Sequence, residues 1–106
     1  MIEIIDSKTG LKYEIFSQDL KDSMDFNEAK HACKILGEGW RLPSLRELEL
    51  MYDLYQKGVG NFSAYYYWSS VVDYDKIWYW DFREGFGYAD YSAKYDLKNV
   101  RPIRSI

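Results

Sequence analysis

Apolar and polar positions along the chain alternate at first, then recur with helical spacing, and then alternate again. In residues 11–16, apolar side chains alternate with charged ones, which is typical of a strand with one buried face. Asp6 and Gly10 separate this run from the β-rich segment 2–5, and both residue types suit a tight turn. The pattern therefore predicts an N-terminal β-hairpin over residues 2–16.

Two helices are expected next, and each starts with a capping-box pattern. Asp25 is followed three residues later by Glu28, and Ser44 is followed three residues later by Glu47. Apolar residues then recur every three or four positions, so each helix has one face for a core. Glycines follow both runs and predict where the helices stop. The predicted helices run from Phe26 to Leu36 and from Ser44 to Gly58.

The remaining chain alternates again and predicts an antiparallel meander. Strands are expected over residues 67–72, 77–82 and 86–91, with a tight turn at residues 83–85 and a short final strand within 99–106. On the middle strand, alternation places Trp78, Trp80 and Phe82 on the core face and Ile77, Tyr79 and Asp81 on the other. A hairpin, two helices and a twisted antiparallel sheet make an α+β fold. Residues 1–106 are expected to form a single domain.

Composition and charge exclude several classes of function. With 14 basic and 17 acidic residues the net charge is -3, which argues against sequence-independent nucleic-acid binding and against general attraction to anionic membranes. No apolar run approaches the roughly 20 residues of a membrane span, so no membrane insertion is expected. No signal-peptide pattern is present, so we expect a cytoplasmic protein or a mature fragment of an exported one.

Candidate catalytic and metal chemistry is sparse. One cysteine (Cys33) and one histidine (His31) exclude an intrachain disulfide and an ordinary zinc site, and we expect no cofactor. Cys33 lies on the apolar stripe of the first helix, whereas His31 lies off it. Neighbouring Ser69 and Ser70 point to opposite faces of a strand, which argues against a shared catalytic pocket. Asp73 and Asp75 flank Tyr74 in a loop and could hold a calcium ion together with backbone carbonyls, but solvated carboxylates are the commoner outcome in a turn.

Five segments occur in an order that resembles a known bacterial domain family. They are DSKTGLKY (6–13), GWRLPSLREL (39–48), YYWSS (66–70), the spacing of Trp78, Phe82 and Gly85, and VRPIR (100–104). Together they resemble the Lcl C-terminal domain family, a bacterial domain of unknown function. Tyr13 stands where this family usually has tryptophan, and Ile103 stands where valine is common. Both substitutions preserve bulk.

The resemblance implies a C-type-lectin-like fold related to the formylglycine-generating enzymes, with the N- and C-terminal strands close together. It also implies glycan binding, since members of the family on bacterial adhesins bind glycans. The calcium-binding tripeptides of true C-type lectins are absent, and so are reactive cysteines in the C-terminal half. The resemblance therefore implies neither calcium-dependent sugar binding nor the oxidase chemistry.

The arginines suit structural roles. Arg41 is expected to tie loops together with its fixed fork of donors, although an anion-binding role is an alternative. Arg101 and Arg104 are expected to pair with Asp73 and Asp75 or with other acids.

Aromatic residues are the unusual feature of this composition. The chain has 5 Phe, 4 Trp and 11 Tyr, concentrated between residues 62 and 95. A single sheet cannot bury so many phenols with partners for every hydroxyl, so some must be exposed. Exposed tyrosines beside carboxylates make good binding faces. The predicted ligand-binding residues are Asp73, Tyr74, Asp75, Tyr79, Asp81, Tyr88 and Tyr91.

The predicted function is therefore a non-catalytic binding module, with a glycan or a protein as partner. A structural or oligomerising domain, as a monomer or a trimer, is the alternative. An enzyme is a weaker alternative, because the chain has few groups that could act as nucleophile, base or metal ligand. Tyrosines could equally serve as amphipathic cladding of a small fold, and both interpretations stay open at this point.

Overall fold

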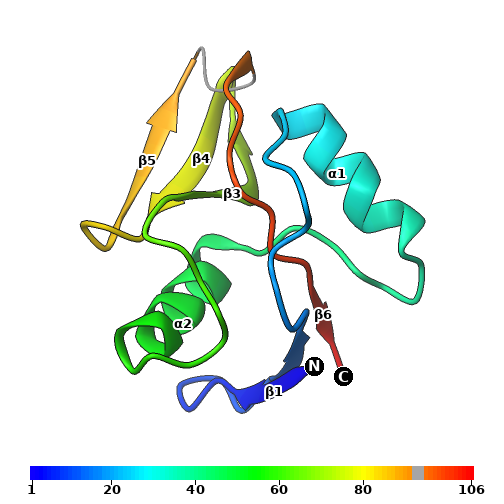
Figure 1. Ribbon diagram of the computed structural model, residues 1–106, viewed down its shortest axis with the longest axis vertical. Coiled ribbons are helices and arrows are strands. Elements are labelled where there is room, and N and C mark those ends of the chain that lie inside the picture. Colours follow the sequence, from blue (N-terminus) through cyan, green and yellow to red (C-terminus); the bar gives the residue numbers. More distant parts are fainter. Residues whose placement is uncertain (92–94) are drawn as a thin grey trace.

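Two helices and two three-stranded antiparallel sheets make up the computed structural model, which describes residues 1–91 and 95–106. The elements in chain order are β1 (Ile2–Ile5), β2 (Lys12–Ile15), α1 (Phe26–Ile35), α2 (Leu45–Gln56), β3 (Tyr66–Asp73), β4 (Lys76–Asp81), β5 (Phe86–Asp90) and β6 (Ile103–Ser105). The terminal sheet has the order β1-β2-β6 and the main sheet the order β3-β4-β5. Figure 1 shows the terminal sheet in the lower half of the molecule, below the main sheet, with β6 at the same height as α2. The α+β prediction is confirmed.

The terminal sheet brings the two ends of the chain together. β2 pairs antiparallel with β1 on one side and with β6 on the other, so that Ile15 lies opposite both Ile2 and Ile103. Asp6 caps the β1–β2 turn by accepting a hydrogen bond from the backbone N–H of Lys8 at 2.9 Å. The predicted hairpin and the predicted proximity of the terminal strands are both confirmed.

Both predicted capping boxes are present. The Asp25 carboxylate accepts from the Glu28 N–H at 2.9 Å, and the Glu28 carboxylate accepts from the Asp25 N–H at 3.0 Å. Ser44 and Glu47 exchange the same two bonds at the start of α2. The buried Glu47 carboxylate also accepts two bonds from Arg41, at 2.6 and 2.9 Å. Arg41 therefore fastens its loop to α2, which is the structural role predicted for it.

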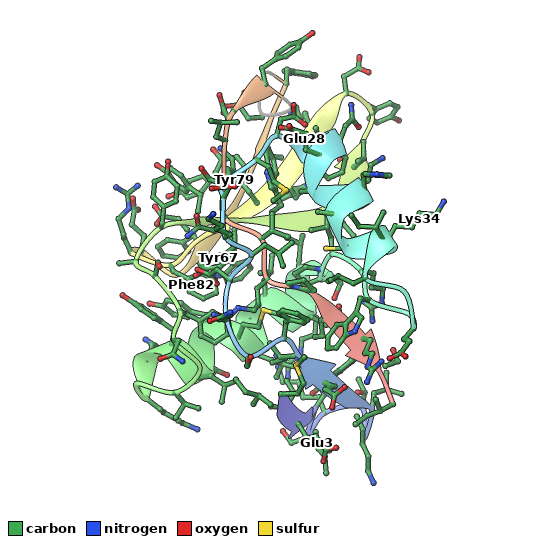
Figure 2. The ribbon with its side chains drawn as sticks, turned by 45° about the vertical axis from the view of Figure 1, so that its right-hand side comes forward. Glu3, Glu28, Lys34, Tyr67, Tyr79 and Phe82 are labelled. Atoms are coloured by element: carbon green, nitrogen blue, oxygen red, sulfur yellow. The ribbon has the colours of Figure 1, made fainter. Side chains whose placement is uncertain are left out.

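The two faces of the main sheet belong to different hydrophobic cores. On β3, Trp68 packs edge-on against Phe26 of α1, whereas its neighbour Tyr67 packs with Phe82 and with Leu48 of α2. The Tyr67 and Phe82 rings are 4.4 Å apart, and Figure 2 shows them together in the interior. Both faces are thus covered, one by each helix. Cys33 is buried in the core next to α1, and His31 is exposed, as predicted.

The predicted division of β4 into a core face and an outer face is partly wrong. Trp80 and Phe82 pack in the core next to α2, but Trp78 belongs to neither core as far as the described residues define them. Ile77, expected on the outer face, is buried in the core next to α1, and Tyr79 packs against that core. The alternation separates the two faces of β4 correctly. It does not show that a helix covers each of them, so it wrongly predicts one core face and one outer face.

The predicted arginine pairs form with acids other than Asp73 and Asp75. Arg101 is fully buried and its guanidinium contacts the Asp19 carboxylate at 2.8 Å, and Arg104 contacts the Glu14 carboxylate at 2.5 Å. Both arginines therefore hold parts of the scaffold together. No helix in the described part of the chain is long and apolar enough to cross a lipid bilayer.

An ion pair links the terminal sheet to α2 and makes stability depend on pH. Arg46 donates to the two Asp6 carboxylate oxygens at 2.8 and 3.1 Å. The Arg46 side chain and the Lys8 backbone N–H lower the pKa of Asp6 from 3.8 to about 2. A carboxyl whose pKa is depressed in the folded state stabilises the fold above its unfolded pKa. This stabilisation is therefore lost as the pH falls from about 4 to about 2.

We expect Asp6→Asn to be less stable than the wild type at pH 7 and to lose less stability on acidification, because it has no carboxylate to protonate. The measurement is urea unfolding at pH 7, 4 and 2. Arg46→Met should reduce the acid-dependent loss in the same way, because it removes the donor that lowers the pKa. An equal decline of the wild type and both variants between pH 4 and pH 2 would contradict this account.

Candidate ligand-binding groove

The tyrosines near the main sheet divide into buried and exposed ones. Tyr67 is fully buried, and its hydroxyl donates to Asp19 at 2.7 Å. In contrast, Tyr74 exposes 93% of its surface, Tyr91 63% and Tyr88 38%. Some of these phenols therefore serve the core, while others present their rings to solvent.

Three of the predicted ligand-binding residues border one shallow groove of about 270 Å³. Tyr74 and Asp75 come from the β3–β4 turn, and Tyr91 directly follows β5. The start of α1 supplies the facing wall. The groove is thus lined by a mixture of aromatic, aliphatic and polar side chains, namely Phe26, Asn27, Lys30, Val72, Tyr74, Asp75, Ile77 and Tyr91.

Two lysines rest on aromatic rings of this groove. The Lys30 ammonium lies 4.9 Å from the centre of the Phe26 ring, and the Lys76 ammonium lies 5.0 Å from the centre of the Tyr91 ring. Cation–π contacts at exposed sites are weak, of the order of 0.5–1 kcal/mol. Both ammonium groups can therefore move aside for a ligand and donate hydrogen bonds to it.

Tyr79 and Tyr88 form a pair of neighbouring rings that do not line the groove. They lie opposite each other on β4 and β5 with ring centres 6.0 Å apart. The Lys98 ammonium lies 4.1 Å from the centre of the Tyr79 ring. Burial raises the pKa of Tyr79, and a hydrogen bond to Glu84 raises the pKa of Tyr88, so both stay neutral phenols at pH 7. Figure 2 shows Tyr79 on the main sheet.

The groove and this tyrosine pair lie on the same face of the main sheet. Ile77 lines the groove, and Tyr79 stands two residues further along β4, so the two side chains point the same way. A ligand longer than the groove can therefore extend from Tyr91 towards Tyr88.

Asp81 occupies a different environment from the other predicted binding residues. It is buried, and Arg83 holds its carboxylate with backbone and side-chain hydrogen bonds of 2.8 and 3.2 Å. Burial raises its pKa, but the bonds from Arg83 outweigh this effect and lower the pKa below its usual value. The carboxylate therefore shapes the β4–β5 turn and is not presented at the exposed face with Tyr79.

The described residues offer little for catalysis or for a metal. None of the described His, Cys, Asp and Glu side chains forms a cluster of three or more that could hold a metal ion, Asp73 and Asp75 included. Burial raises the pKa of the Cys33 thiol to about 12, so it is not a thiolate at neutral pH. Ser69 is buried and its hydroxyl donates to the Trp78 carbonyl at 2.6 Å. What the groove supplies is stacking area, hydrogen-bond groups and charge.

Sequence reasoning did not find the contribution of α1 to the groove. Phe26, Asn27 and Lys30 lie more than 40 positions before Tyr74, and no local pattern connects the two segments. Their helical spacing identifies a shared face but not what that face meets. Sequence reasoning also does not find Lys98, a buried lysine whose ammonium lies over the rings of Tyr66, Trp68 and Tyr79.

Comparison of the sequence with protein-family models gives no match, and comparison with curated proteins gives none either. The site is therefore interpreted from its own geometry.

Proposed function

We propose that this protein is a non-catalytic binding module of the C-type-lectin-like kind, and that its ligand binds in the groove between Tyr74 and Tyr91. The observation that carries the proposal is Tyr74 itself. Its backbone has φ 55 and its ring is almost fully exposed at the tip of the β3–β4 hairpin. A bulky residue in the left-handed region costs of the order of 1 kcal/mol, and strain of this kind clusters at functional sites.

The chemistry of the groove supports a glycan or a protein segment as the ligand. Tyr74 and Tyr91 offer ring faces on which a sugar ring or an apolar side chain can stack. Asn27, Lys30 and Asp75 can exchange hydrogen bonds with hydroxyl or peptide groups. The resemblance to the Lcl C-terminal domain family supports the glycan in particular.

A glycan array tests this proposal with three variants. Tyr74→Gly removes the exposed ring and relieves the left-handed strain, so it should bind at least about tenfold more weakly without losing stability. Tyr91→Ala should show a similar loss. Phe86→Ala is the matched control. Phe86 lies on β5, its ring is about as exposed as that of Tyr91, and it does not line the groove. The array is read with and without calcium, and equal binding is expected in both.

Panning the same proteins against a random peptide library covers the protein ligand. Ligands selected on the wild type should lose binding to Tyr74→Gly and Tyr91→Ala and keep it to Phe86→Ala. Ligands of either kind that bind all four proteins equally would contradict the proposed site.

A further inference from the structure

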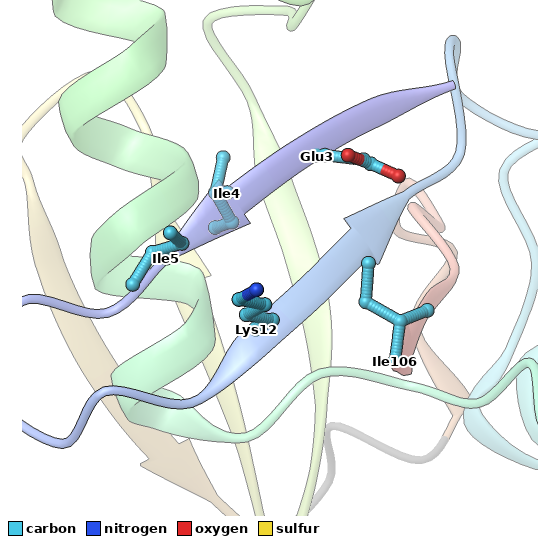
Figure 3. A pocket seen from close by; sticks show the side chains of 5 residues that line it. All are labelled: Glu3, Ile4, Ile5, Lys12 and Ile106. Carbon is cyan, nitrogen blue, oxygen red and sulfur yellow. The ribbon is translucent and has the colours of Figure 1, made fainter.

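β1 is an outer strand with an open edge. It pairs with β2 on one side, and no described strand pairs with the other side. Ile5 exposes 61% of its surface and Ile106 56%. Figure 3 shows β1 beside β2, with Ile106 on the far side of β2. A hollow of about 360 Å³ lies here, larger than the groove but without an aromatic wall, bordered by Glu3, Ile4, Ile5, Lys12 and Ile106.

The hydrogen bonds of the hairpin show which backbone groups of β1 point inwards. The Asp6 N–H donates to the Leu11 carbonyl at 2.8 Å, which makes these two residues a hydrogen-bonded pair. Hydrogen-bonded and non-hydrogen-bonded pairs alternate along an antiparallel ladder. Ile4 and Tyr13, two positions further along the register, are therefore also a hydrogen-bonded pair, and the N–H and C=O of Ile4 face β2.

The same alternation directs the N–H and C=O groups of Glu3 and Ile5 to the open edge. The other side of the hairpin agrees with this assignment. Lys12 lies opposite Ile5, yet its carbonyl accepts a hydrogen bond from the Ile106 N–H at 3.1 Å, on the side away from β1. Ile5 and Lys12 are thus a non-hydrogen-bonded pair, and the backbone groups of Ile5 remain available to another strand.

We propose that β1 pairs with β1 of a second copy of this chain, antiparallel and around a two-fold axis at Ile4, so that the two terminal sheets form one continuous sheet. In this register Ile4 lies opposite the partner's Ile4, and Glu3 lies opposite the partner's Ile5. Each outward N–H and C=O of Glu3 and Ile5 then gains a partner. β1 reads IEII and has neither the proline nor the lysine that commonly protects an edge strand.

Charge complementarity selects the second copy and this register. Within one hairpin, Lys12 lies opposite Ile5. In the dimer the partner's Ile5 is therefore flanked by the partner's Lys12 on one side and by Glu3 on the other. Glu3 and the partner's Lys12 are then two strand spacings apart, about 10 Å, within the combined reach of two long side chains. The two-fold axis makes this contact twice. Two other registers keep the faces aligned. The register centred on Glu3 places Glu3 opposite the partner's Glu3, which like charges disfavour. The register centred on Ile5 lies at the end of β1, so it pairs less of the strand and moves Glu3 away from the partner's Lys12.

Sedimentation equilibrium over a wide concentration range tests the dimer. We expect the mass to rise with concentration from 12.7 kDa towards twice that value. Glu3→Pro should remain monomeric with an unchanged circular dichroism spectrum, since proline is tolerated where the N–H faces out of an edge strand. Glu3→Lys and Lys12→Glu should each weaken the dimer about threefold or more, and the double reversal should restore it.

Four results would overturn the proposal. The first is a wild type that stays monomeric at its highest soluble concentration. The second is a trimer, because pairing of β1 around a two-fold axis joins two chains and leaves no free β1 edge for a third. The third is a Glu3→Pro variant that still dimerises. The fourth is a double charge reversal that dimerises no better than the single reversals.

Discussion

Arg101→Ala is expected to lose about 3–5 kcal/mol of unfolding free energy, which is a large part of the roughly 5–15 kcal/mol typical of a domain. Arg101 is fully buried, and its guanidinium donates to Asp19 at 3.0 Å and to the carbonyls of Gly60 and Asn61 at 2.8 and 3.0 Å. It also stacks 4.0 Å over the centre of the Phe62 ring. The truncation removes the charged partner of the Asp19 carboxylate, which keeps the hydrogen bond from the Tyr67 hydroxyl, and leaves the carbonyls of Gly60 and Asn61 without this donor.

Urea unfolding at pH 7 measures this loss. Arg101→Lys should recover only part of it, because an ammonium cannot reproduce the planar fork that reaches Asp19 and two carbonyls at once. Arg104→Ala is the matched control. Arg104 is partly exposed and pairs with Glu14, so its removal should cost about 1 kcal/mol. Equal losses for Arg101→Ala and Arg104→Ala would contradict the role given to Arg101.

Trp68→Ala is expected to lose a comparable amount, about 3–5 kcal/mol. The Trp68 side chain is fully buried between Phe26 and the main sheet, and its indole N–H donates to the Met24 carbonyl at 2.7 Å. The Lys98 ammonium lies 5.0 Å from its ring. The substitution therefore creates a cavity, removes one of the two hydrogen bonds that the Met24 carbonyl accepts, and removes part of the aromatic surroundings of a buried cation.

Trp78→Ala is the control for this second prediction. Trp78 is half-buried on the adjacent strand and belongs to neither core, so its removal should cost less than about 1 kcal/mol. Urea unfolding measures both variants. A loss for Trp78→Ala as large as that for Trp68→Ala would contradict the greater burial and packing assigned to Trp68.

The local features of the fold were predictable because each depends on residues close in sequence. Asp25 with Glu28 fixes the start of α1, and the alternation over residues 11–16 fixes the second arm of the hairpin. The contrast between Trp68 and Trp78 was not predictable, because both occur in alternating runs. Only the packing of a helix against each face decides which ring is enclosed.

The candidate site was predictable in part for the same reason. Tyr74 and Asp75 are neighbours in the loop between β3 and β4, and a break between two alternating runs of the sequence predicts this loop. The alternation of β4 places Asp81 on the same face as Tyr79 and so predicts a shared site, but Arg83 folds back over the Asp81 carboxylate. The alternation of a strand predicts which face a side chain lies on, but not that Arg83 pairs with the Asp81 carboxylate.

The claim that the groove next to Tyr74 is the ligand site is tested most directly by NMR. The ¹⁵N-labelled protein is titrated with the glycan or peptide that binds it best. The account predicts that the largest chemical-shift changes fall on the backbone amides of Asn27, Asp75 and Tyr91, which come from three separate segments. Largest changes on the amides of Ile5 and Lys12 in the terminal sheet, with none around the groove, would contradict it.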